Sequence, residues 1–225
     1  MSSASLADRY QRIRASLPPH VELIAVSKTR SVAEIRALYA LGHRAFGENY
    51  PQELKEKHAQ LPADVEWHFI GHLQRSNVKH VVGITRLIHG VDSEKLLDEI
   101  EKRAADRGLR VDVLLQVHVA EEDTKHGFAP EELRTIVQQP LPFSRWPHVR
   151  FRGLMGMATN TADPGRVSSE FAHLAALFKE IRAMGIQPPQ PFDTLSMGMS
   201  SDAEVAIAQG STMVRIGTAL FGERG

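Results

Sequence analysis

The chain has 225 residues, and its 27 Lys and Arg residues balance its 27 Asp and Glu residues, so the formal net charge is zero. This balance argues against a nucleic-acid or membrane-surface role, and we expect neither kind of partner. Hydrophobic residues make up 42%, enough for a folded core, and the absence of cysteine excludes disulfides, thiolate chemistry and Cys-bound zinc. The N-terminus lacks a signal-peptide core and no apolar stretch reaches transmembrane length, so we expect a cytoplasmic protein with one domain over residues 1–225.

Apolar runs of strand length alternate along the chain with segments of helical periodicity. The eight predicted strands are Leu23–Lys28, Ala45–Asn49, Glu66–Gly71, Leu87–Asp92, Val111–Val119, Phe151–Ala158, Thr194–Ser200 and Met213–Phe221. The predicted helices lie at about 31–41, 50–59, 76–82, 93–107, 130–138, 164–184 and 202–209, and another, about Leu6–Leu17, precedes the first strand. This alternation predicts an α/β fold, a single-domain TIM-like (β/α)8 barrel. The extra N-terminal helix is expected to cover part of the barrel wall or its lower opening.

Lys28 ends the first predicted strand, three residues before a helical pattern begins at Ser31. At the rim of a buried sheet its amine is partly desolvated, which favours the neutral amine over the ammonium ion. A neutral amine can attack an aldehyde and form a Schiff base. Taken alone, such a lysine is more often a strand-end residue that reaches solvent, because buried lysines are rare.

Two segments near the end of the chain predict a phosphate site. Barrel active sites lie at the carboxyl ends of the strands, and phosphate groups often dock after strands seven and eight. Ser200 and Ser201 lead into a helix and offer hydroxyl and amide groups, while Gly217 and Thr218 offer a close backbone approach and another hydroxyl. Each segment alone is equally well explained by helix capping or by a glycine kink, but together they predict a cradle for a phosphate monoester.

Alternation along the last strand places Met213, Arg215 and Gly217 on one face and Val214 and Ile216 on the other. If the two β-branched residues pack outward under helices, the arginine points into the barrel mouth. A buried arginine needs an acceptor, and a structural carboxylate is the alternative to a ligand.

The 11 histidines are scattered without a paired metal-binding spacing on one face. His68 and His72 are four residues apart, but Gly71 and the strand context are incompatible with a metal-binding helix. We therefore expect no metal site.

A family resemblance rests on six parts of the chain: Ile24–Thr29, Phe46–Tyr50, Trp67–Gly71 with Leu73-Gln74, Gly153–Met157, Leu195–Asp202 and Val214–Gly222. The chain resembles the pyridoxal phosphate homeostasis protein family, single-domain relatives of alanine racemase with a barrel of the alanine racemase N-terminal-domain type. These segments are specific jointly rather than singly. The chain departs from the family pattern at Pro51, and at Arg75–Lys79, where the family usually has an Asn-Lys pair.

The resemblance implies pyridoxal 5'-phosphate (PLP) as the cofactor, held as a Schiff base. The implied binding residues are Lys28 at the aldehyde, Asn49 near the ring, Ser200, Gly217 and Thr218 at the phosphate, and Arg215 at the pyridine nitrogen. A permanent cation beside that nitrogen disfavours its protonation, so the ring withdraws electrons less strongly.

The leading interpretation is therefore an intracellular PLP carrier or reservoir that acts in vitamin B6 homeostasis without catalytic turnover. Its expected partners are PLP and, transiently, apo forms of PLP enzymes that receive it, and we expect a monomer. One alternative is a PLP-dependent amino-acid racemase, which needs a second acid/base group that the larger relatives supply from an additional domain. Another is a Schiff-base aldolase on a sugar phosphate, which shares the lysine and the phosphate cradle.

Overall fold

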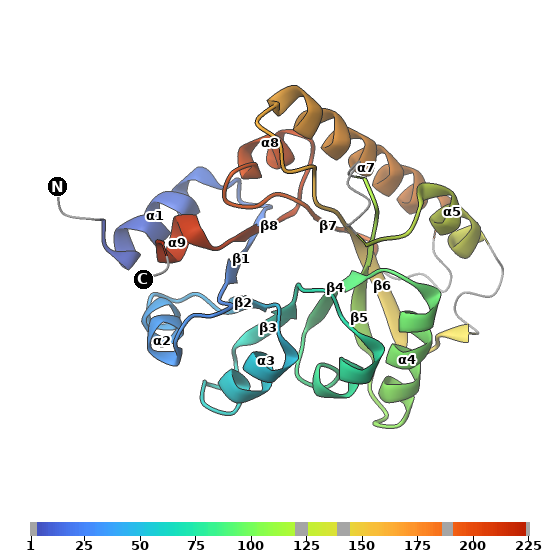
Figure 1. The fold of residues 1–225 in the computed structure, drawn as a ribbon, viewed down its shortest axis with the longest axis horizontal. Helices are drawn as coiled ribbons and strands as arrows, with labels where there is room; N and C mark the ends of the chain where they lie inside the picture. The colour runs from blue at the N-terminus through green and yellow to red at the C-terminus, as the bar shows by residue number, and fades with distance from the viewer. Residues whose placement is uncertain (1–3, 120–125, 139–144, 186–190, 224–225) are drawn as a thin grey trace.

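The computed structural model describes residues 4–119, 126–138, 145–185 and 191–223. Its strands are all parallel and close into a ring in chain order, from β1 beside β2 round to β8 beside β1 (Figure 1). The strands are β1 Glu22–Val26, β2 Ala45–Glu48, β3 Glu66–Phe69, β4 Leu87–Val91, β5 Val111–Gln116, β6 Val149–Met155, β7 Thr194–Ser196 and β8 Met213–Ile216. The predicted eight-stranded β/α barrel is confirmed.

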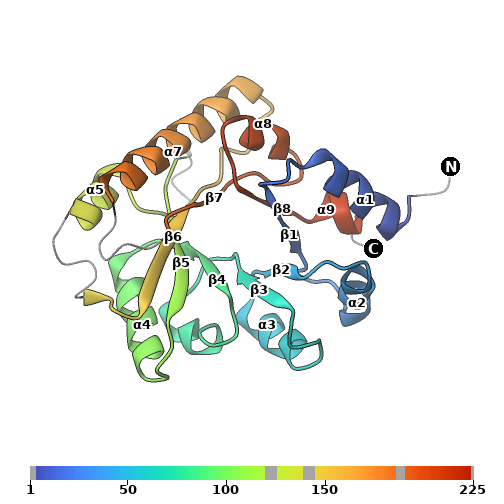
Figure 2. The ribbon, with the colours of Figure 1, turned by 180° about the vertical axis from the view of Figure 1, so that it is seen from behind.

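The helices lie outside the ring of strands, as the two opposite views show (Figures 1 and 2). They are α1 Leu6–Ser16, α2 Val32–Ala40, α3 Pro51–His58, the 3-10 helix η1 Arg75–His80, α4 Glu94–Ala105, α5 Pro130–Gln138, α7 Pro164–Met184, α8 Ala203–Ala208 and α9 Thr218–Phe221. Within the described ranges, no helix combines the length and apolarity that a membrane crossing requires.

Short-range signals explain where the helices next to the site begin. The Ser31 hydroxyl accepts from the Glu34 amide, and the Glu34 carboxylate accepts from the Ser31 amide, which is a reciprocal cap for α2. Pro51 stands at the first turn of α3, where its missing N–H costs no helical hydrogen bond. The departure at Pro51 is therefore compatible with the fold.

The strands end earlier than the sequence predicted. β1 stops at Val26 and β7 at Ser196, so Lys28 and Ser200 lie in the loops that follow. The prediction of a strand through Phe221 is wrong, because β8 ends at Ile216 and a short helix follows. Gly217, with φ −114° and ψ −82°, leaves the extended conformation, and its carbonyl accepts from the amides of Leu220 and Phe221.

One apolar core lies inside the ring of strands, and a second lies between the strands and the surrounding helices. A small inner cluster consists of Ile24, Ala45, Leu87, Leu114, Met155 and Met213. A larger cluster holds the outward strand residues and the helices, and it includes Val214 and Ile216. The predicted alternation along β8 is therefore confirmed, with Met213 inside and the two β-branched residues outside.

Helix α1 covers the wall of the barrel beside β8 and β1, next to α9 (Figures 1 and 2). The Arg9 guanidinium holds the two helices together, because it donates to the carbonyls of Leu220 at 2.7 Å and Phe221 at 3.1 Å. Of the two predicted locations for the N-terminal helix, the structure therefore shows the wall.

Candidate functional site

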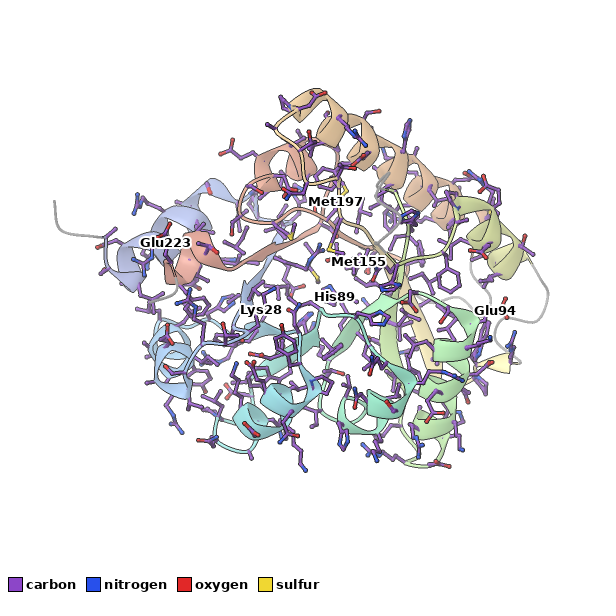
Figure 3. All side chains as sticks on the ribbon, viewed as in Figure 1. Lys28, His89, Glu94, Met155, Met197 and Glu223 are labelled. Carbon is purple, nitrogen blue, oxygen red and sulfur yellow. The ribbon has the colours of Figure 1, made fainter. Side chains whose placement is uncertain are left out.

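Lys28 follows β1 by two residues and faces the interior of the barrel mouth. The preceding side chain, Ser27, points outward, where its Oγ lies 2.5 Å from Glu48 Oε1. Lys28 itself lies in a turn, which the hydrogen bond from the Arg30 amide to the Ser27 carbonyl closes. In Figure 3, Lys28 and His89 lie toward the middle of the ring of strands, whereas Glu94 lies at its outer edge.

A buried ion-pair network behind Lys28 fixes the main chain on both sides of it. Lys57 of α3 is only 6% exposed and donates to the Ser27 carbonyl at 2.8 Å and to Glu53 Oε2 at 2.7 Å. Glu53 Oε2 also accepts from the Thr29 amide at 2.8 Å. Thr29 has φ +61°, the one positive φ of a non-glycine residue in the described chain. The network therefore maintains a strained backbone next to the lysine.

The same network contains a buried carboxylate. Glu48 is fully buried, and its Oε1 accepts from Lys57 Nζ at 2.8 Å. Burial raises the pKa of Glu48, while the hydrogen bond and charge of Lys57 act in the opposite direction. The lysine is thus the counterion that keeps this carboxylate inside the protein.

The loops after β7 and β8 meet around the Ser200 hydroxyl. Ser200 Oγ accepts from the main-chain amides of Gly217 at 3.3 Å and Ala219 at 3.4 Å. Ser200 and Thr218 are both exposed, so the hydroxyls and the amides are accessible from the mouth. An oxygen atom thus already lies where two amides converge. This pair of amides is the kind of donor set that a phosphate oxygen requires.

Arg215 lies on the inner face of β8 and is 4% exposed. Its guanidinium donates to the Ser196 carbonyl at 2.9 Å, to Ser196 Oγ at 2.7 Å and to the Gly156 carbonyl at 3.3 Å. Within the described residues no carboxylate forms an ion pair with it, although the charge of Asp202 acts on it electrostatically. Burial lowers the pKa of Arg215 to about 10, which leaves it a cation at neutral pH.

A chain of hydrogen bonds runs from Arg215 down the barrel interior. Ser196 Oγ lies 3.1 Å from His89 Nδ1, and His89 Nε2 lies 3.0 Å from His68 Nδ1. Burial lowers the pKa of both histidines, that of His68 to about 3, so both rings are neutral. A guanidinium can only donate, so Ser196 Oγ accepts from Arg215; if the hydroxyl in turn donates to His89, then His89 donates to His68. The remaining N–H of His68 then faces Glu22, whose Oε1 lies 4.0 Å away.

Asn49 extends from the end of β2 and is half-buried. Its Oδ1 is buried without a hydrogen-bond partner among the described residues. Gly71 packs against its main chain so closely that a Cβ there would lie 2.4 Å from the Asn49 carbonyl oxygen. Tight packing therefore fixes the backbone of Asn49, while its side-chain oxygen is left for a ligand.

A cavity of about 410 Å³ opens beside the Ser200 loop. Its lining includes Thr159, Met199, Ser201 and Asp202, but neither Lys28 nor Arg215. It is therefore a neighbour of the candidate site rather than the site itself.

The six residues predicted for the site lie on, or in the segments that follow, four adjacent strands, β7, β8, β1 and β2. The segment after β8 approaches β1 closely at Gly217, because a Cβ there would lie 3.4 Å from Val26 Cβ. Sequence reasoning missed the support behind the site, namely Lys57, His68, His89 and Ser196. These residues lie on separate elements, and their spacing along the chain carries no signal. The roles of the six residues toward a cofactor stay a prediction.

The whole chain, residues 1–225, matches the family model of the alanine racemase N-terminal domain. The chain is 42% identical over 205 residues to the pyridoxal phosphate homeostasis protein of Aquifex aeolicus, covering 90% of this chain and 87% of the relative. It is 39% identical over 214 residues to the protein of that name from Bos taurus, covering 90% of this chain and 77% of the relative.

The structures of PipY from Synechococcus elongatus are also similar. The form without PLP has a TM-score of 0.90 at 37% identity, and the form with PLP bound has 0.86 at 36%; each alignment covers 97% of this chain and 100% of PipY. An alanine racemase from Clostridium difficile shares the fold, with a TM-score of 0.79 at 16% identity, covering 97% of this chain and 56% of the racemase. With these identities over nearly its full length, the chain belongs to the pyridoxal phosphate homeostasis protein family.

Proposed function

We propose that this protein binds PLP reversibly at the barrel mouth, as a Schiff base on Lys28, and serves in PLP homeostasis without catalytic turnover. The observation that carries the proposal is the convergence of two amides on Ser200 Oγ, in the loops that follow β7 and β8, with β8 beside the strand that leads to Lys28. PipY, with PLP bound in one structure, supports it at 36% identity.

The residues at the mouth fit the chemical groups of PLP. The amides of Gly217 and Ala219, with the hydroxyls of Ser200 and Thr218, offer hydrogen-bond donors to a phosphate. The inward-facing Lys28 offers a primary amine to the aldehyde, on a backbone held by Lys57 and Glu53. When bound, PLP supplies an aldehyde and an electron-withdrawing ring.

Arg215 favours binding over catalysis. Its charge is permanent at neutral pH, and three hydrogen bonds to neutral oxygens hold it on the inner face of β8. A cation facing the pyridine nitrogen opposes protonation of that nitrogen, which weakens electron withdrawal by the ring. We therefore expect little or no racemase, transaminase or decarboxylase turnover on common amino acids.

The experiment is reduction of the PLP-loaded full-length protein with borohydride, followed by peptide mapping. The pyridoxyl group should be on Lys28, and Lys28→Ala should lose the visible absorbance band of bound PLP. Lys79→Ala, a variant of an exposed lysine, is the matched control and should keep both signals. A label on another lysine would refute the assignment.

The racemase alternative has its own test. Purified protein loaded with PLP is incubated with single enantiomers of common amino acids, and the enantiomers are separated by chiral chromatography. We expect no racemisation above that of Lys28→Ala. Robust racemisation that disappears in Lys28→Ala would establish the enzyme in place of the carrier.

A further inference from the structure

Three potential metal ligands converge at the barrel mouth, on the side of β3, β4 and β5. His72 follows β3, Asp92 follows β4, and His126 lies where the chain returns to β5; their ligand atoms all lie within 4.8 Å of one another. His72 Nδ1 lies 3.2 Å from Asp92 Oδ2, and the two imidazole rings are stacked with centroids 4.2 Å apart. The three residues come from separate parts of the sequence, so their spacing predicted no metal site.

Glycine packing brings the first two ligands together. A Cβ on Gly71 would lie 2.4 Å from the Asn49 carbonyl oxygen, and a Cβ on Gly90 would lie 2.5 Å from the Gly71 carbonyl oxygen. Only glycine permits these contacts, so the ends of β2, β3 and β4 pack backbone to backbone. His72 directly follows the first of these glycines, and Asp92 lies two residues after the second.

The third ligand projects from a main chain that is bonded to the end of β5. Gln116 Nε2 donates to the His126 carbonyl at 2.6 Å. The amide of His118 donates to the Phe128 carbonyl at 3.0 Å, and the amide of Phe128 donates to the Gln116 carbonyl at 2.8 Å. The main chain that carries His126 is therefore held beside β5, which lowers the entropic cost of binding an ion, while the exposed ring is free to turn toward that ion.

Asp92 lacks a permanent counterion in the described chain. Its side chain is only 11% exposed, and its partners there are His72 and the Ser93 hydroxyl at 3.1 Å, with no lysine or arginine. A largely buried carboxylate is stabilised by pairing or by coordination to a metal. A bound cation would supply that positive charge.

We propose that His72, Asp92 and His126 form a binding site for one divalent transition-metal ion of the zinc class. Imidazole nitrogen with carboxylate oxygen is a zinc donor set, whereas Mg²⁺ and Ca²⁺ prefer oxygen ligands throughout. The 3.2 Å separation between His72 and Asp92 is close to the edge of about 3.3 Å of a tetrahedron with arms of about 2.0 Å. The His72 side chain is 46% exposed, so an ion can reach the three ligands from solvent.

A second cluster, on the floor of the barrel, is electrostatically unsuited to a cation. It consists of Glu22, Glu66 and His68. Arg86 pairs with Glu66, and both Arg86 and Arg152 line the small cavity there. Two guanidinium groups repel a metal ion, so the mouth cluster carries the proposal alone.

The test is titration of the PLP-free full-length protein, carrying no polyhistidine tag, with Co²⁺ as a spectroscopic substitute for zinc. We expect one Co²⁺ per chain with visible d–d absorption, which zinc should displace. His72→Ala, Asp92→Asn and His126→Ala should each weaken Co²⁺ binding by at least about tenfold. His20→Ala, a variant of an exposed histidine outside the cluster, should bind like the parent.

Asp92→Asn keeps the shape of the side chain, so it separates loss of a ligand from loss of the fold, and thermal melting of each variant checks this directly. Lys28→Ala should retain full cobalt binding, which makes failure of this proposal distinguishable from failure of the PLP proposal. No d–d absorption in the parent protein, or equal affinity in the parent and all three site variants, would overturn the metal site.

Discussion

Lys57 Nζ lies 2.8 Å from the main-chain oxygen of Ser27, the residue directly before Lys28. A buried lysine on α3 thereby positions the lysine proposed to hold the cofactor. The same amine forms ion pairs with Glu48 and Glu53, so one cation holds β1, β2 and α3 together behind the site.

Replacing this cation should destabilise the protein strongly. We expect Lys57→Met to lower the free energy of unfolding by about 3–5 kcal/mol, because Glu48 would remain buried without its counterion. The double variant Lys57→Met/Glu48→Leu should recover much of that loss, since it removes both buried charges. Urea denaturation of both variants and the parent measures this. A double variant as unstable as Lys57→Met, or less stable, would contradict the role of Glu48.

Ser196 connects Arg215 to the buried histidines, so its hydroxyl should matter beyond stability. Ser196→Ala removes one acceptor from Arg215 and one hydrogen-bond partner from His89, and should cost about 1–3 kcal/mol of unfolding free energy. It should also shift the absorbance maximum of bound PLP, if Arg215 faces the pyridine nitrogen. Ser211→Ala is the matched control, because Ser211 is buried and donates only to main-chain carbonyls. Equal spectra for the two variants would exclude a positioning role for Ser196.

Gly153 has no room for a side chain. A Cβ there would lie 1.7 Å from the Thr194 carbonyl oxygen, and its φ of +154° is unfavourable for other residues. Gly153→Ala should cost at least about 3 kcal/mol, because β6 and β7 would have to separate. Gly210 also has a positive φ, +97°, but a Cβ there would meet no atom within 4 Å. Gly210→Ala should therefore cost only about 1–2 kcal/mol. Thermal melting compares the two, and similar losses would show that backbone strain rather than packing dominates.

His43 should make the protein sensitive to acid. Burial lowers the pKa of His43 from 6.5 to about 4, so the folded protein resists a proton that the unfolded chain accepts between these values. The contribution of neutral His43 to the free energy of unfolding is complete above pH 6.5. It is lost as the pH falls toward 4, by up to about 1.4 kcal/mol per pH unit.

The variant His43→Phe preserves an aromatic ring beside Tyr10 and Phe46. Denaturation at pH 7 and pH 5 should show a smaller loss of stability on acidification in the variant than in the parent. Comparing the two proteins cancels the contribution of other groups, such as Glu48, because burial raises the pKa of that group in both proteins. Equal losses would mean that His43 is protonated in the folded protein.

The sequence alone determined the barrel, because alternating strand and helix patterns leave few ways to bury both faces of a parallel sheet. It also predicted the inward direction of Arg215, since alternation along a strand depends only on residue spacing. Strand ends were less predictable: β8 stops at Ile216 because hydrogen bonds to the Gly217 carbonyl begin a helix, which apolar patterning does not reveal.

Only the tertiary structure decided which distant side chains meet. The hydrogen-bond chain from Arg215 through Ser196 and His89 to His68 joins four strands, and the cluster of His72, Asp92 and His126 joins three strand ends. Such contacts depend on the register between strands and on glycines that allow backbones to touch. Neither leaves a periodic signal along the chain, because the interacting residues come from separate β/α units.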